Sequence, residues 1–231
     1  MGRLAKLLRL PVDVWQMLVT WLPGPCGHAL RHRFWKARLK SLGEGTRIDV
    51  GVHFEGPGWI SIGSHCWIDR NVLILAGPPR AGRTTHEKAN DGFTLVTGEV
   101  AIGDRTHLAP NVVISGLGGV QIGAACGVAS GAAIYSYSHH YKDAAARAAT
   151  TQFAFTPLAR DDQQAMISGP VVLEDYCAVG LHAVLLPGAL LRRGTWVASG
   201  IVTGGSFAPQ SLVHEQRAVA TRSLADLTIR T

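Results

Sequence analysis

Two adjacent histidines, His139 and His140, are the residues best suited to chemistry in this sequence, and they lie near the end of the run IYSYSHHY over residues 134–141. Imidazole ionises near neutral pH, so a histidine on a rigid support can remove a proton from a substrate hydroxyl. A histidine pair can also be polar surface with no task. Its position, where regular repeats give way to a long polar stretch, favours a general base.

The chain around this pair follows a period of six. Between Val120 and Gly205 an apolar residue recurs at every sixth position, and a small or branched residue follows it after four places. The apolar positions are Ile122, Val128, Ile134, Leu173, Val179, Leu185, Leu191 and Val197. Period six fits neither an ordinary strand nor a helix. It predicts short strands joined by tight corners, wound as an all-β parallel β-helix of hexapeptide repeats with three hexads in each coil.

The same period sets the expected domain organisation. Hexads start near Thr46, and polar stretches interrupt them twice, so each stretch must leave the coil at a corner as an external loop. We expect a basic, amphipathic helical segment over 1–45, the β-helix over 46–213 with loops 76–98 and 141–169, and a tail over 214–231. The repeats cover most of the chain, so we expect no second globular domain.

Positive charge concentrates at the N-terminus. The first forty residues hold eight lysines and arginines but one carboxylate, Asp13, in a chain with a net charge of +6. The apolar run over 10–22 is shorter than the ~20 residues of a bilayer span. Asp13 and two tryptophans argue against a cleaved signal peptide. A helix at the membrane interface and a helix capping the β-helix are both consistent with this segment.

Four cysteines show no metal-binding spacing. Cys66, Cys126 and Cys177 occupy the small inward position of a hexad, and Cys26 lies before the repeats. We therefore predict buried free thiols rather than disulfides or metal ligands. Free thiols are typical of a reducing cytoplasm.

In its motifs the sequence resembles the left-handed β-helix acyltransferases with hexapeptide repeats, and among them the sugar and polysaccharide O-acetyltransferases of the colanic-acid and maltose/galactoside types. The resemblance covers about residues 43–222. It is carried by IGSHCWIDRNV, VAIGDRTHLAPNVVI, the coil ending in SHHY, PVVLEDYCAVGLHAVLLPGALL and VASGIVT. It implies a left-handed β-helix that transfers an acetyl group from acetyl-CoA to a sugar hydroxyl of a surface polysaccharide, lipopolysaccharide or glycan precursor.

The resemblance also implies roles for particular residues. His139 matches the family's catalytic base, and His140 takes the next position on the acceptor side. Asp69 matches a residue that contacts the acceptor sugar, although an aspartate at a corner can simply bond its own backbone. The family's donor site would use Gly180, Leu181, Ala198 and Ser199 along the pantetheine arm and Arg217 and Arg222 near the CoA phosphates. Ala178 departs from the pattern, since the family commonly has tryptophan there.

The family resemblance further implies a homotrimer with His139 at the subunit boundary and no metal. We expect a protein of the cytoplasm, or one peripheral to the inner face of the cytoplasmic membrane. A catalytically silent β-helix that serves as a scaffold or binding module is the main alternative. A γ-class carbonic anhydrase would need three histidines from adjoining subunits on zinc, and the spacing of the histidines here does not match. The sequence lacks nucleotide-binding glycine motifs and any nucleic-acid-binding module.

Overall fold

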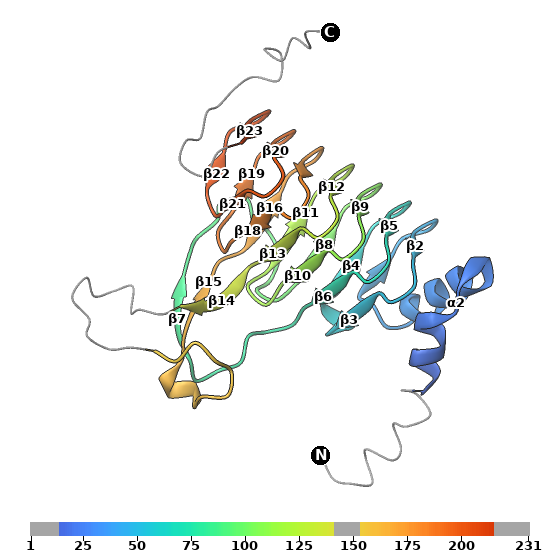
Figure 1. Ribbon diagram of the computed structural model, residues 1–231, viewed down its shortest axis with the longest axis horizontal. Helices are drawn as coiled ribbons and strands as arrows, with labels where there is room; N and C mark the ends of the chain where they lie inside the picture. Colours follow the sequence, from blue (N-terminus) through green and yellow to red (C-terminus); the bar gives the residue numbers. More distant parts are fainter. Residues whose placement is uncertain (1–13, 141–152, 215–231) are drawn as a thin grey trace.

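The computed structural model describes residues 14–140 and 153–214, and in these residues three parallel sheets wind into a left-handed β-helix of triangular cross-section (Figure 1). Sheet A contains β1 (Ser41–Leu42), β4 (Ile60–Ile62), β8 (Val100–Ile102), β11 (Val120–Ile122), β16 (Val171–Leu173), β19 (Leu190–Leu191) and β22 (Ser206–Phe207). Sheet B contains β2 (Arg47–Ile48), β5 (Trp67–Ile68), β9 (His107–Leu108), β12 (Gly127–Val128), β17 (Ala178–Val179), β20 (Trp196–Val197) and β23 (Leu212–Val213). Sheet C contains β3 (His53–Glu55), β6 (Leu73–Leu75), β10 (Val113–Ser115), β13 (Ala133–Tyr135), β18 (Val184–Leu185) and β21 (Val202–Thr203). This confirms the predicted fold class.

The core is a stack of the inward hexad residues. Ile62, Ile102, Ile122 and Leu173 pair in register from coil to coil, and each is at most 3% exposed. Burying an aliphatic side chain of this size contributes roughly 1.5–3 kcal/mol. The small positions that follow are buried as well, because a corner leaves room for little more than a methyl, thiol or hydroxyl group.

A ladder of thiols and hydroxyls runs down the corner between sheets A and B. Thr46 Oγ1 donates to the Gly63 carbonyl at 2.6 Å, and Cys126 Sγ donates to the Glu174 carbonyl at 3.2 Å in the next coil. Cys66, Cys126 and Cys177 are free and buried, as predicted. Burial raises the pKa of the Cys66 thiol, which therefore stays neutral and acts as a small hydrogen-bonding core residue.

Helices cover the N-terminal end of the β-helix. Residues 14–21 are helical, and α2 (Gly24–Lys36) follows directly. From α2, Trp35 packs edge-on against Phe54 of the first coil. The buried Arg31 guanidinium donates to the carbonyls of Ile48, Val19 and Leu22, and burial lowers its pKa. Arg31 thus ties both helices to coil one, and α2 caps that coil.

No helix among residues 14–140 and 153–214 is long and apolar enough to span a bilayer. The first strand, β1, begins at Ser41, ahead of the β-helix start expected at residue 46. The short helix η1 (Pro57–Trp59) lies between the first two coils. The structure describes only His214 of the expected tail over 214–231.

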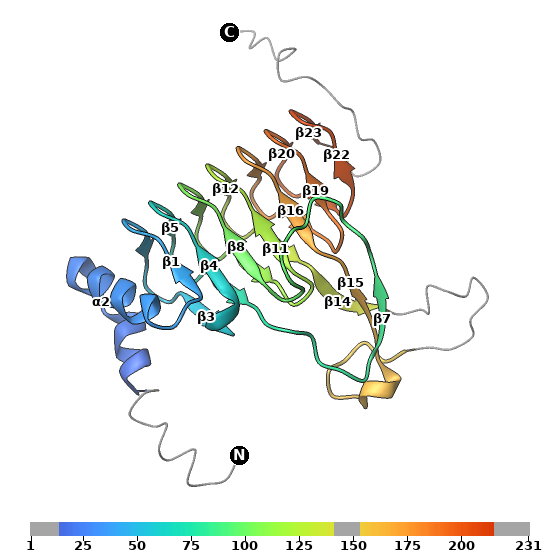
Figure 2. The same cartoon turned by 180° about the vertical axis from the view of Figure 1, so that it is seen from behind.

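The two polar insertions join to form one projection, which we call the arm. Both leave the β-helix after a strand of sheet C, at β6 and β13, and both return to sheet A. The arm contains β7 (Thr84–Glu87), β14 (Tyr137–His140), η2 (Asp161–Gln163) and β15 (Ala165–Ser168). In it β15 pairs antiparallel with β14 and parallel with β7. Figures 1 and 2 show the arm standing away from the coils. The second insertion leaves the coil directly after Tyr135, before the loop start expected at residue 141.

Candidate active site

His139 lies on β14, beside a fully buried amide. Its Nε2 is 3.3 Å from Oε1 of Gln164, a side chain with 0% exposure. The ring of Phe155 lies 5.2 Å from the imidazole, centroid to centroid, at an angle of 48°. Phe155 itself is 69% exposed. One side of the imidazole is thus fixed by the interior of the arm, and an exposed aromatic ring lies close by.

The pleat of the arm sheet separates the two adjacent histidines. His139 pairs with the buried Met166 of β15, while His140 pairs with Ala165 on the opposite face. His140 contacts His86 of β7 with ring centroids 5.5 Å apart, nearly perpendicular. His139 and His140 therefore point to different faces and cannot act on the same substrate atom.

Ion pairs and a crossing segment hold the arm in place. Arg83 Nε donates to Asp161 Oδ1 at 3.0 Å, which joins the first insertion to the second, and the Arg83 side chain is only 10% exposed. Residues 88–94, which we call the strap, cross sheet A, where Asn90 Nδ2 donates to the carbonyls of Pro170 and Ala189 (Figure 2). The support beneath His139 is therefore attached to the coils at several points.

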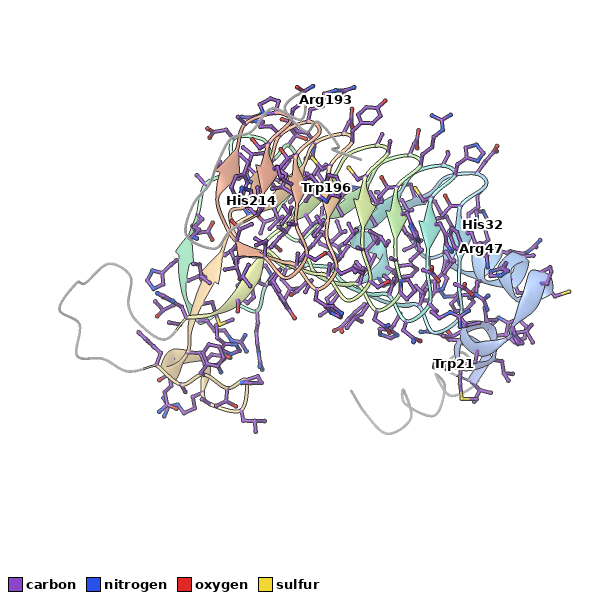
Figure 3. The ribbon with its side chains drawn as sticks, turned by 45° about the horizontal axis from the view of Figure 1, so that its top comes forward. Trp21, His32, Arg47, Arg193, Trp196 and His214 are labelled. Carbon is purple, nitrogen blue, oxygen red and sulfur yellow. The ribbon has the colours of Figure 1, made fainter. Side chains whose placement is uncertain are left out.

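A groove of about 450 Å³ runs along sheet B and its corner toward sheet C. Its floor includes Gly127 and Ala178, and the side chains of His107 and Trp196 flank them along the same row. A Cβ added at Gly127 would meet no atom within 4 Å. Trp196 is 49% exposed, and Figure 3 shows it toward the C-terminal half of the β-helix. The hollow exists because small residues interrupt a row that is aromatic on either side.

Three of the four predicted pantetheine residues line this groove. They are Gly180, Leu181 and Ser199. Ala198 is not among the lining residues, because its side chain packs against the core. Arg217 and Arg222, predicted near the CoA phosphates, lie outside the described residues. Ala178, on the groove floor, occupies the position where the family pattern has tryptophan. Its pairing partner in the next coil is Trp196, so the groove still has an indole beside that position.

Asp69 lies at the corner between sheets B and C, away from the arm. Its Oδ1 accepts the backbone N–H of Arg70 at 2.8 Å, and its Oδ2 is 3.6 Å from His107 Nε2. The structure thus places Asp69 beside the groove wall and apart from His139 in the same chain. Asp69 thus stabilises its own corner and lies next to His107.

Several residues of this region were not predicted as site residues. His107 and Trp196 each directly precede an inward hexad residue, as do Gly127 and Ala178 in the same row, so counting hexads could have identified them. Gln164 and Phe155 lie in a non-repetitive stretch, where the sequence carries no signal for their contact with His139.

The arm and the groove occupy different parts of one chain. No described residue that lines the groove belongs to the arm. The arm leaves at the corner between sheets C and A, and the groove lies on sheet B and the corner toward sheet C.

Within residues 14–140 and 153–214 there is also no group of three or more His, Cys, Asp or Glu side chains placed to hold a metal ion.

The sequence matches no protein-family model and no curated protein. Among solved structures, AntD, an N-acyltransferase from Bacillus cereus, matches as a mutant in complex with dTDP and coenzyme A, with a TM-score of 0.63 at 18% identity over 84% of this chain and 89% of that chain. Another AntD mutant, in complex with dTDP-4-amino-4,6-dideoxyglucose and coenzyme A, matches with a TM-score of 0.61 at 17% identity over 79% and 82%. A hexapeptide-repeat containing acetyltransferase from Vibrio cholerae, complexed with acetyl coenzyme A, has a TM-score of 0.49 at 22% identity over 98% and 92%. At these identities the likeness to AntD shows that the two chains share a fold.

Proposed function

We propose that this protein is an acyltransferase that moves an acetyl group from acetyl-CoA to a sugar hydroxyl of a surface polysaccharide, lipopolysaccharide or glycan precursor. The observation that carries the proposal is one imidazole, His139, held by a buried partner on an arm anchored to the coils. A rigid support is what general-base catalysis requires. The motif resemblance to sugar O-acetyltransferases supports the substrate class.

The groove on sheet B is the site proposed for the donor. Its length along the coils, its small-residue floor and its flanking Trp196 suit a narrow, extended chain such as pantetheine. AntD was crystallised with coenzyme A, which supports a CoA-linked donor for a protein that shares its fold. The groove lining is mostly apolar, so the charged end of a CoA would lie outside it.

His139 would take the proton of the acceptor hydroxyl as that oxygen attacks the thioester carbonyl. The new C–O bond forms, the C–S bond breaks and the electron pair leaves with the thiolate. A thiol with a pKa of ~8.5 leaves readily, so the reaction needs help from a base more than from an acid. The proton on His139 can then return to the thiolate, which closes the cycle with no net change in the protein.

Transfer to an amino group is the competing chemistry, because AntD is an N-acyltransferase and was crystallised with an amino sugar linked to dTDP. Product analysis separates the two reactions. Hydroxylamine cleaves an O-acetyl ester and leaves an N-acetyl amide intact. We expect an ester.

We further propose a homotrimer in which the arm of one subunit reaches the groove of the next. The separation of arm and groove within one chain supports this arrangement. Each subunit would then contribute its arm to one site and its groove to another. A closed ring of identical subunits completes every site. A monomeric mass in solution at micromolar concentration would contradict the proposal.

The direct test is the loss of His139. His139→Ala should lower kcat for acetyl transfer by ~10²–10⁴-fold. The control is His53→Ala on β3, an exposed histidine remote from both the arm and the groove. Thiol release from acetyl-CoA with mixed sugar acceptors gives the readout. Unchanged turnover in His139→Ala would contradict the assignment. A wild-type protein that releases no thiol with any acceptor would favour a scaffold.

We propose a cytoplasmic location at the inner face of the membrane, with the helix over residues 14–21 as the contact. Trp15, Met17, Leu18 and Trp21 are 49–61% exposed on this helix, while Val19 alone is buried against the protein. The surplus of basic residues in the first forty positions complements anionic lipid. An acceptor carried on a lipid would then meet the enzyme at the membrane surface.

A double variant, Trp15→Glu with Leu18→Glu, should abolish cosedimentation with vesicles that contain anionic lipid. It should also abolish activity on a lipid-linked acceptor and spare activity on a soluble one. Leu158→Glu, at a residue 94% exposed on the arm, is the matched control. Equal vesicle binding by the double variant and the wild type would refute the membrane contact. The membrane contact would also be refuted if removal of residues 1–25 left both vesicle binding and activity on a lipid-linked acceptor unchanged.

A further inference from the structure

The amide of Gln164 has a determined orientation. Gln164 follows η2, and its side chain is fully buried beneath His139. Its Nε2 lies 2.6 Å from the backbone carbonyl oxygen of Ala159. A carbonyl oxygen can only accept a hydrogen bond, so the amide atom facing it must be the NH₂ group. The other atom, Oε1, therefore faces His139.

This orientation decides which nitrogen of His139 carries the proton. An amide oxygen also only accepts, so His139 Nε2, at 3.3 Å, must be the donor. A neutral imidazole has one N–H, and its other nitrogen holds the free electron pair. We infer that Gln164 is a positioning residue that holds His139 in the Nε2–H tautomer and leaves Nδ1 as the nitrogen that receives the acceptor's proton. Its catalytic meaning rests on the proposed function.

Gln164 also suits the protonated state of His139. When Nδ1 takes a proton, the imidazolium donates from both nitrogens, and the bond from Nε2 to Oε1 becomes charge-assisted. A flipped amide would set the NH₂ group against the Nε2–H and the oxygen against the Ala159 carbonyl. Both hydrogen bonds of the amide would then be lost, because donor would face donor and acceptor would face acceptor. The amide therefore cannot adapt to the opposite tautomer without penalty.

The tautomer can be read directly by NMR, whatever the activity. In protein labelled with ¹⁵N-histidine, long-range proton–nitrogen spectra distinguish a protonated from an unprotonated ring nitrogen, and His139→Ala assigns the signals. We expect an Nε2–H resonance for His139 that exchanges slowly with water, with Nδ1 unprotonated. A wild-type spectrum with the proton on Nδ1 would overturn the inference.

Gln164→Met tests the positioning role, since methionine keeps the length of glutamine and its thioether sulfur accepts a hydrogen bond from Nε2–H only weakly. We expect the slow N–H signal to disappear and kcat to fall at least 10-fold, but by no more than the ~10²–10⁴ loss of His139→Ala. Gln163→Met, at the exposed neighbouring glutamine, is the control.

The outcomes separate this inference from the proposed function. An unchanged N–H signal in a folded Gln164→Met protein would overturn the role of Gln164. If the tautomer is as expected but His139→Ala keeps full turnover, the proposed role of His139 as general base fails while the assignment of the proton stands. If Gln164→Met does not fold, the wild-type spectrum still decides the tautomer.

Discussion

At the scale of single residues, the groove depends on a missing side chain at Gly127. This residue lies between His107 and Ala178 in the row across sheet B, and a Cβ there would meet open space. Gly127→Leu should therefore fold normally while its side chain fills the groove. We expect the KM for acetyl-CoA to rise at least 10-fold through lost contacts, about 1.4 kcal/mol, with the KM for the acceptor unchanged.

Gly58→Leu is the matched control, because a Cβ at Gly58 also meets open space but lies far from the groove. Thermal melting of both variants checks the fold, and initial rates against acetyl-CoA give the KM. A Gly127→Leu enzyme with wild-type KM would show that the donor binds elsewhere.

The sequence predicts residues of the coils far better than residues of the arm. Inward hexad positions such as Ile62 and Ile122 follow from period six, because every coil repeats the same geometry. Outward positions such as His107 follow from the same count. Gln164 and Phe155 follow from no periodicity, since their contact with His139 depends on how two non-repetitive segments pair. The catalytic candidate could thus be read from its motif, but its buried partner could not.

At the scale of elements, the arm needs both insertions. The sequence predicts that each insertion leaves the coil at a corner, and in the structure both leave after a strand of sheet C, at the same corner. It does not predict that β7 adds to β15, because that pairing depends on hydrogen bonds between segments about 80 residues apart. The two loops expected from the sequence are one structural unit.

The ion pair between Arg83 and Asp161 should govern the rigidity of the arm. Arg83→Ala removes a mostly buried guanidinium that links the two insertions. The coils carry their own core, so we expect an unchanged melting temperature, faster hydrogen exchange in β7 and β14, and a kcat lowered by about 10-fold as His139 loses its fixed position.

Arg160→Ala is the comparison for that variant. Its pair with Asp162 is local and exposed, with side chains 77% and 60% accessible, so its removal should change neither exchange nor rate. Equal exchange rates in β7 for Arg83→Ala and the wild type would show that Arg83 does not hold the arm, which the strap, the strand pairing and the ion pair between Arg80 and Asp161 would then secure.

At the scale of the whole molecule, the cap, the groove and the arm lie at different places on the β-helix. The helices and Arg31 close one end, sheet B carries the groove, and the arm projects beyond sheet C (Figures 1 and 2). Each part has a separate structural basis, yet the proposed reaction requires the arm and the groove to meet. The shared site between subunits is therefore the central claim.

Co-expression of two variants, each defective in one half of the site, tests this claim most directly. One variant, His139→Ala, has a defective arm and an intact groove. The other, Gly127→Leu, has an intact arm and a defective groove. Activity is assayed at a low acetyl-CoA concentration, where the raised KM of Gly127→Leu limits its rate. In mixed trimers an intact arm meets an intact groove at about a quarter of the sites, because arms and grooves combine independently around the ring. We predict that acetyl transfer recovers to about that fraction of wild-type activity. Recovery no greater than the sum of the two variants expressed separately would contradict a site shared between subunits.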